Sequence, residues 1–106
     1  MGQRTLIMLT QGSKLTKYEI VFSPSAKFDL QQRLPLKVVD TIISFVYGAL
    51  AENPRRVGKP LDGPFKGAYS ARRGDYRIIY EIREREILVF VTKIQHRAKA
   101  YHRNYR

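Results

Sequence analysis

The sequence contains no cysteine, and this absence removes several classes of chemistry. It excludes disulfide bonds, thiolate nucleophiles, and zinc or iron–sulfur centres held by cysteine. The two histidines, His96 and His102, are six residues apart with no carboxylate nearby, which makes a poor metal site. We therefore expect neither a metal nor another cofactor.

Long apolar runs are also missing. The run at residues 6–9 is four residues long, whereas a signal-peptide core needs about 7–15 apolar residues and a membrane-spanning helix about 20. We expect a cytoplasmic protein with no membrane partner. The length suits one domain with its own core, over residues 18–106, preceded by a flexible N-terminal arm at residues 1–17.

Acidic residues are scarce and basic residues are abundant. The chain has 20 Lys and Arg against 9 Asp and Glu, a formal net charge of +11. No acid follows Glu86, while five Lys and Arg, both histidines and two tyrosines do. Such a charge favours a polyanionic partner, above all the phosphates of a nucleic acid. The alternative is a generally basic surface that serves no partner.

The first half of the chain predicts a strand followed by two helices. Residues 18–22 (YEIVF) are typical of a strand, and Ser23-Pro24 offers an N-cap followed by proline, so a helix should run to about Arg33. A second helix, with apolar residues at three- and four-residue spacing, is expected from about residue 35 to residue 52.

The second half predicts a loop and three strands. Residues 55–67 hold three glycines and two prolines and are expected to form a basic loop. Strands should follow at residues 68–72, 75–83 and 86–94. The fold class is then α+β: a helical hairpin packed on one face of a small twisted antiparallel sheet, with the other face available for a ligand.

Basic residues from several segments could converge on that open face. Arg72 and Arg73 precede the strand of Arg77, and Lys93 ends the next strand. Guanidinium groups bind phosphate in a bidentate fork and tyrosines offer stacking surfaces, so this arrangement suits single-stranded RNA. The alternative for each residue is a solvated charge on a half-exposed sheet. The candidate RNA-binding residues are Lys59, Arg72, Arg73, Lys93, Lys99 and Arg103.

A second constellation could transfer protons. If the tail is helical, Arg97 and Tyr101 share a face and His96 flanks them. Histidine can accept or release a proton at cellular pH, a phenol can relay one, and arginine can stabilise the extra charge of a phosphorane. The alternatives are a strand-end histidine bonded to the backbone and a tyrosine that docks on the core. The candidate catalytic residues are Arg77, His96, Arg97 and Tyr101.

Three motifs resemble a known family. They are KPL-x-G at residues 59–63, S-x-R-x-G-x-Y-R-x-x-Y at residues 70–80 and H-R-x-x-x-Y at residues 96–101. Over residues 18–103 the sequence resembles the RelE branch of the RelE/ParE bacterial toxin superfamily. The resemblance implies a RelE-like fold, a cognate antitoxin that wraps the toxin, and cleavage of mRNA in the ribosomal A site by attack of the RNA's own 2′-OH on the neighbouring phosphate.

The resemblance also implies roles for individual residues. The family's strand arginine after an aromatic matches Arg77, the arginine after the last strand matches Arg97, and His96 fills the preceding basic position. Ser70 stands where the best-known toxin has lysine. The C-terminal catalytic tyrosine is offset, because simple counting puts Arg103 at its place and Tyr101 two residues earlier.

The sequence thus leads to one hypothesis with two alternatives. The hypothesis is the toxin of a toxin–antitoxin module, acting as a metal-independent, ribosome-dependent mRNA endoribonuclease that inhibits translation. In it His96 or Tyr101 takes the 2′-OH proton, and Arg77 and Arg97 hold the scissile phosphate. The alternatives are a ParE-like non-nuclease that poisons DNA gyrase and a non-catalytic basic RNA-binding module.

Overall fold

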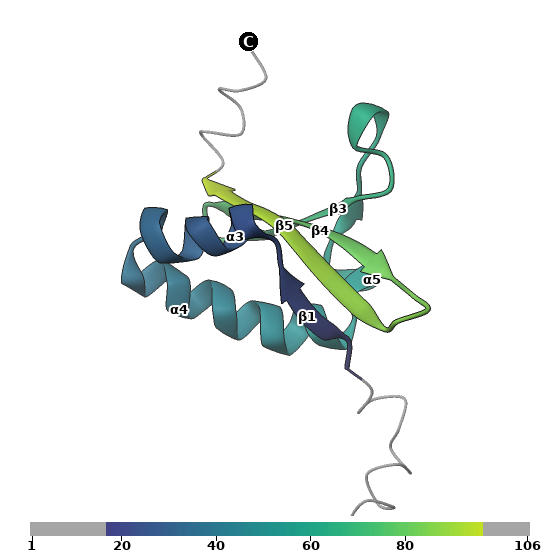
Figure 1. The fold of residues 1–106 in the computed structure, drawn as a ribbon, viewed down its shortest axis with the longest axis horizontal. Helices are drawn as coiled ribbons and strands as arrows, with labels where there is room; N and C mark the ends of the chain where they lie inside the picture. The colour runs from purple at the N-terminus through teal and green to yellow at the C-terminus, as the bar shows by residue number, and fades with distance from the viewer. Residues whose placement is uncertain (1–16, 97–106) are drawn as a thin grey trace, which may run out of the picture.

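The computed structural model describes residues 17–96, in which one sheet is covered on one face by helices (Figure 1). In chain order the elements are β1 (Glu19–Phe22), α3 (Pro24–Phe28), the π-helical segment η1 (Asp29–Arg33), α4 (Leu36–Phe45), the π-helical segment η2 (Val46–Leu50), α5 (Pro54–Val57), β2 (Lys59–Pro60), the 3₁₀ turn η3 (Gly63–Phe65), β3 (Tyr69–Arg73), β4 (Tyr76–Arg83) and β5 (Leu88–His96). The α+β class and the helical hairpin, formed by α3–η1 and α4–η2, are confirmed. No helix within this part of the chain is long and apolar enough to cross a membrane.

The sheet has the strand order β1-β5-β4-β3-β2 and is mixed. The pairs β5–β4, β4–β3 and β3–β2 are antiparallel as expected, whereas β1 runs parallel to β5. A parallel pair needs a long crossover connection, and the helical hairpin with the three strands after it supplies one. The wholly antiparallel sheet predicted from the sequence is therefore corrected at this one pairing.

The core lies between the helices and the covered face of the sheet. Ile42, Val46 and Leu50 recur every four residues along α4–η2 and are buried. They belong to one cluster with buried residues of β3, β4 and β5, among them Ile78 and Tyr80. The apolar face predicted for the second helix is thus the face that holds it to the sheet.

A β-bulge in β5 sets which residues face the core. The register between β4 and β5 shifts between Ile79 and Tyr80, so that Ile79 pairs with Lys93 and Tyr80 with Val91. Thr92 is the extra residue, and because of it both Val91 and Ile94 face the core. Without the bulge, strict alternation would place Lys93 and not Ile94 on the core face.

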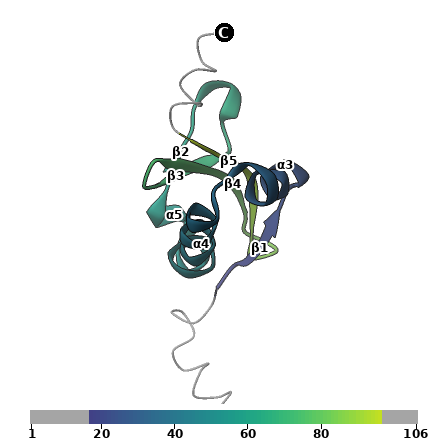
Figure 2. The same cartoon turned by 90° about the vertical axis from the view of Figure 1, so that its left-hand side faces the viewer.

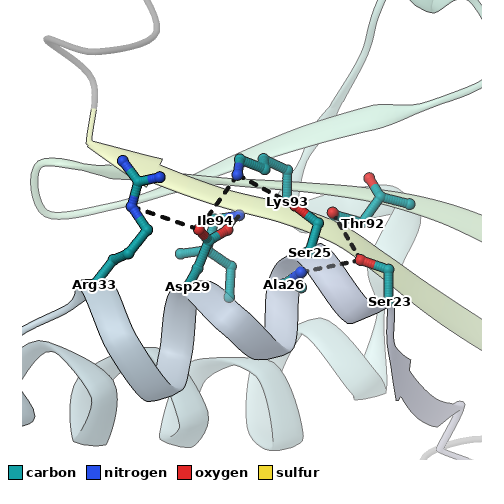
Figure 3. A network of polar contacts seen from close by, with 8 residues as sticks. All are labelled: Ser23, Ser25, Ala26, Asp29, Arg33, Thr92, Lys93 and Ile94. Atoms are coloured by element: carbon teal, nitrogen blue, oxygen red, sulfur yellow. Dashed lines mark hydrogen bonds and ion pairs between the residues drawn. The ribbon is translucent and has the colours of Figure 1, made fainter.

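The first helix seals the edge of β5 beyond the point where β1 ends. Ser23 caps α3 by accepting a hydrogen bond from the Ala26 amide at 3.0 Å, and its Oγ donates to the Thr92 carbonyl oxygen at 2.9 Å (Figure 3). Asp29, whose side chain is 1% exposed, accepts a hydrogen bond from the Ile94 amide at 3.1 Å. Two side chains thus replace the backbone partner that a longer β1 would provide.

The segment predicted as a loop contains three short elements. α5 begins at Pro54, β2 pairs with β3, and η3 forms a turn between them. Proline at the first position of a helix loses no hydrogen bond, which is why Asn53-Pro54 both ends one helix and begins another. Residues 61–68, which follow β2, lie on the side of the sheet away from α4 (Figure 2).

Tyr80 ties α5 to the sheet at a point where only glycine fits. Its buried hydroxyl donates to the Pro54 carbonyl oxygen at 2.6 Å. Burial, with a smaller contribution from Tyr69, raises the pKa of Tyr80, so the hydroxyl remains a donor. A Cβ added at Gly58 would overlap Tyr80 Oη and lie 3.1 Å from the Ser70 carbonyl oxygen.

Alanine substitutions at two glycines should therefore change the stability in opposite directions. Gly58→Ala should lower the free energy of unfolding by about 2–4 kcal/mol through overpacking and loss of the Tyr80 hydrogen bond. Gly48→Ala, at a helical position with no atom within 4 Å of the added Cβ, should raise it by about 0.5–1 kcal/mol. Urea denaturation followed by circular dichroism measures both. Equal effects at the two positions would contradict the close approach at Gly58.

Candidate functional site

The open face of the sheet carries two neighbouring rows of paired residues. Residues paired across strands lie on the same face, so the register places each row. The first row crosses four strands and the second crosses three, in the order Lys59, Ser70, Ile79 and Lys93 for the first and Arg72, Arg77 and Gln95 for the second. Arg72 and Arg77 are thereby brought to one face, as predicted, and Lys59, which was expected in a loop, joins them there.

The residues of these rows that belong to β4 and β5 lie on the floor of a cleft of about 790 Å³. Residues of β4 and β5, including Arg77 and Gln95, line the floor, and the loop of residues 61–68 forms a wall. In Figure 2 this loop stands on the side opposite α4. The cleft is thus bounded by a rigid sheet below and by a hydrogen-bonded loop at the side.

Arg77 has a buried polar atom on the floor of this cleft. Within residues 17–96 its Nε has no hydrogen-bond partner, and no ion pair includes Arg77 or Arg72. The two arginines are directly opposite each other on β3 and β4, a placement that costs energy for like charges. Glu81, the acid that lines the cleft, is engaged by Arg83 at 3.0 Å. An anion is the ligand that would relieve this arrangement.

Lys93 lines the cleft, but its ammonium group is engaged at the sheet edge. Nζ lies 3.2 Å from Asp29 Oδ1 and 3.2 Å from Ser25 Oγ (Figure 3). Arg33 Nε adds a longer ion pair with the same carboxylate, at 3.9 Å. Lys93 is therefore paired with an acid, whereas no ion pair within residues 17–96 includes Arg77.

Arg73 and His96 lie on the other face, which corrects the expected convergence. Successive residues of a strand alternate between faces, so Arg73, Tyr76 and His96 form a row on the helical side. The Arg73 guanidinium lies over the Phe45 ring at 5.6 Å, and the His96 ring packs edge-on against Tyr76 with centroids 5.1 Å apart. Arg73 therefore does not join Arg72 and Arg77 on the open face.

The remaining predicted residues lie outside the described part of the chain. They are Arg97, Lys99, Tyr101 and Arg103, and their roles stay predictions. Among residues 17–96 there is no group of three or more His, Cys, Asp or Glu side chains that could hold a metal.

Sequence reasoning missed two features of this site. One is Asp29, since no local signal in the sequence shows that its side chain reaches a strand 65 residues later in the chain. Phe65 lines the cleft and is 62% exposed. An aromatic residue in a loop rich in glycine and proline was the signal that could have revealed it.

Comparison with known proteins identifies the fold and the family. The model of the ParE toxin of type II toxin–antitoxin systems matches residues 20–101. Toxin RelE of Mycobacterium tuberculosis is 41% identical over 87 residues, which cover 82% of this chain and 89% of the relative. This chain belongs to the RelE/ParE toxin superfamily. It is a toxin of a type II toxin–antitoxin module.

Further relatives assign this RelE/ParE toxin to the RelE-like branch. Toxin RelG of M. tuberculosis is 38% identical over 86 residues, covering 81% of this chain and 98% of the relative. The crystal structure of the toxin–antitoxin complex RelBE2 of M. tuberculosis matches with a TM-score of 0.75 and 38% identity, covering 80% of this chain and 97% of that one. The RelE-like fold expected from the motifs is confirmed.

Proposed function

We propose that this toxin is a metal-independent, ribosome-dependent endoribonuclease that cuts mRNA in the ribosomal A site and so inhibits translation. The observation that carries the proposal is the buried Nε of Arg77 on the floor of the cleft, opposite Arg72, which has no hydrogen-bond partner within residues 17–96. A phosphodiester supplies the negative charge and the bidentate acceptor that this guanidinium lacks. The RelE name of one relative supports the same reading.

The chemistry would use the RNA's own 2′-OH as the nucleophile. The 2′ oxygen attacks the neighbouring phosphorus, the bond from phosphorus to the 5′ oxygen breaks, and the products are a 2′,3′-cyclic phosphate and a 5′-hydroxyl. Arg77, with Arg97, would stabilise the charge of the phosphorane, as positioned cations do in such transition states. Tyr101 would take the 2′-OH proton, because His96 lies on the helical face of the sheet, away from Arg77. Lys59 and Arg72, which share the open face with Arg77, would position the strand.

We also propose a cognate antitoxin as the protein partner. The solved relative RelBE2 is a toxin–antitoxin complex. The physical reason in this chain is its formal net charge of +11 and the basic open face, both of which suit an acidic partner.

Mapping of mRNA 5′ ends in cells after brief induction tests the nuclease. We expect new ends clustered at fixed positions within codons of translated messages. The family model that matches carries the ParE name, which keeps gyrase poisoning as a second candidate. Intact messages together with DNA breaks would support that candidate. Intact messages together with salt-dependent RNA binding would instead indicate a non-catalytic RNA-binding module.

A further inference from the structure

The wall of the cleft presents an aromatic side chain to solvent. Phe65 ends η3, is 62% exposed and lines the same cleft as Arg77. Single exposed apolar residues are common on protein surfaces. Phe65 differs because its exposed ring borders the cleft whose floor carries Arg77.

The loop holds this ring in place through its own backbone. The Leu61 amide donates to the Ala68 carbonyl oxygen at 2.9 Å, and the Ala68 amide donates to the Phe65 carbonyl oxygen at 3.0 Å. Gly63 and Gly67 have φ values of 62° and 103°, which glycine adopts without strain. The ring is therefore presented by a closed, hydrogen-bonded turn, so little conformational entropy would be lost when a ligand packs against it.

A guanidinium on the floor and an aromatic ring on the wall match the two parts of a nucleotide. The guanidinium binds phosphate, and an aromatic face stacks with a base of any sequence. Lys66, next to Phe65, adds another cation to the wall. A peptide could also pack against an exposed ring, but it would give the buried Nε of Arg77 an acceptor only if it placed an acid there.

We propose that Phe65 is a nucleobase-stacking residue, which fixes one base of a single-stranded RNA beside the phosphate held by Arg77. This inference rests on the proposed function and adds to it the wall of the cleft, residues 61–68, as the part of the site that holds the base. Stacking by Phe65 would orient the RNA backbone over the cationic floor before any bond is broken.

The absence of tryptophan from the chain provides a direct test. Phe65→Trp places the sole tryptophan of the protein in the cleft, where a stacked base should quench its fluorescence. Single-stranded RNA hexamers, with and without an abasic site at one position, are the probes. We expect quenching by the intact hexamer, and we expect Phe65→Leu to weaken RNA binding at least about 5-fold, the lower end of the stacking contribution per base.

A second exposed phenylalanine serves as the control. Phe28 is 53% exposed on α3 and is not part of the cleft, so Phe28→Leu should leave RNA binding unchanged. Circular dichroism and thermal melting establish that each variant is folded. Abasic sites should weaken binding to the wild type but not to Phe65→Leu, because the stacking partner is already gone.

The possible results separate this inference from the proposed function. RNA binding that needs Arg77 but is unchanged in Phe65→Leu, with no quenching of the tryptophan fluorescence of Phe65→Trp, would overturn stacking alone. No RNA binding by the wild type would overturn stacking, and uncut messages in cells would overturn the nuclease. If Phe65→Leu weakens the antitoxin complex and not RNA binding, the loop is a protein interface and the inference is wrong.

Discussion

Replacement of Arg77 by methionine should lower the rate of mRNA cleavage by about 10²–10³-fold, the effect of removing one positioned charge-stabilising group from a transition state. Methionine keeps an unbranched apolar stem but removes the charge and the donors of the guanidinium. The rate is measured on programmed ribosomes by primer extension. Arg77→Lys should recover part of the activity, because an ammonium group keeps the charge but not the bidentate geometry.

The same substitution should not reduce stability. Arg77 is opposite Arg72 and its buried Nε has no partner, so its removal relieves a repulsion and an unsatisfied donor. We expect the thermal midpoint of Arg77→Met to equal or exceed that of the wild type. Arg83, on the same strand, pairs with Glu81 at 3.0 Å and lies over the Phe90 ring at 5.0 Å, so Arg83→Met is a control that should keep full activity. Full activity in Arg77→Met would contradict the proposed site.

Replacement of Asp29 by alanine should lower the free energy of unfolding by about 2–4 kcal/mol. The buried amide of Ile94 would lose its acceptor, and Lys93 would lose its counter-ion. The amide is the larger contribution, because the side chain of Lys93 is 36% exposed and its ion pair is weakened by solvent. The thermal midpoint of a domain this size should fall by about 4–8 °C for each kcal/mol.

Two further variants divide this effect. Asp29→Asn keeps an oxygen that can accept the Ile94 hydrogen bond and should lose only part of the stability. Asp40, exposed on α4, gives a control substitution, Asp40→Ala, that should change little. An equal loss in Asp29→Asn and Asp29→Ala would show that the ion pairs, and not the strand-edge hydrogen bond, account for the stability.

The elements of the fold could be predicted because their signals are local. Ser23-Pro24 marks the start of the first helix through its cap, and the apolar spacing of α4 defines its buried face. The parallel pairing of β1 with β5 and the bulge at Thr92 could not be predicted in this way. Both depend on which strands meet after the chain has folded, and no local pattern carries that information.

The site was predictable to the same extent. Arg77 and Arg72 were expected on the open face, and the register places them there side by side. Arg73 was assigned by its position in sequence, although the next residue of a strand points to the opposite face. Phe65 belongs to a loop, where no periodicity relates sequence to direction, so its place in the cleft required the structure.

The central position of β5 has a consequence for the synthesis of this toxin. β5 is the last described strand to leave the ribosome, yet it lies between β1 and β4 and provides part of the cleft floor. A nascent chain that ends before β5 has no partner for β1 and leaves one edge of β4 unpaired. The five-stranded sheet therefore cannot form. The order of strands thus delays an intact cleft until translation has passed β5, which limits the activity that a partly made toxin could show.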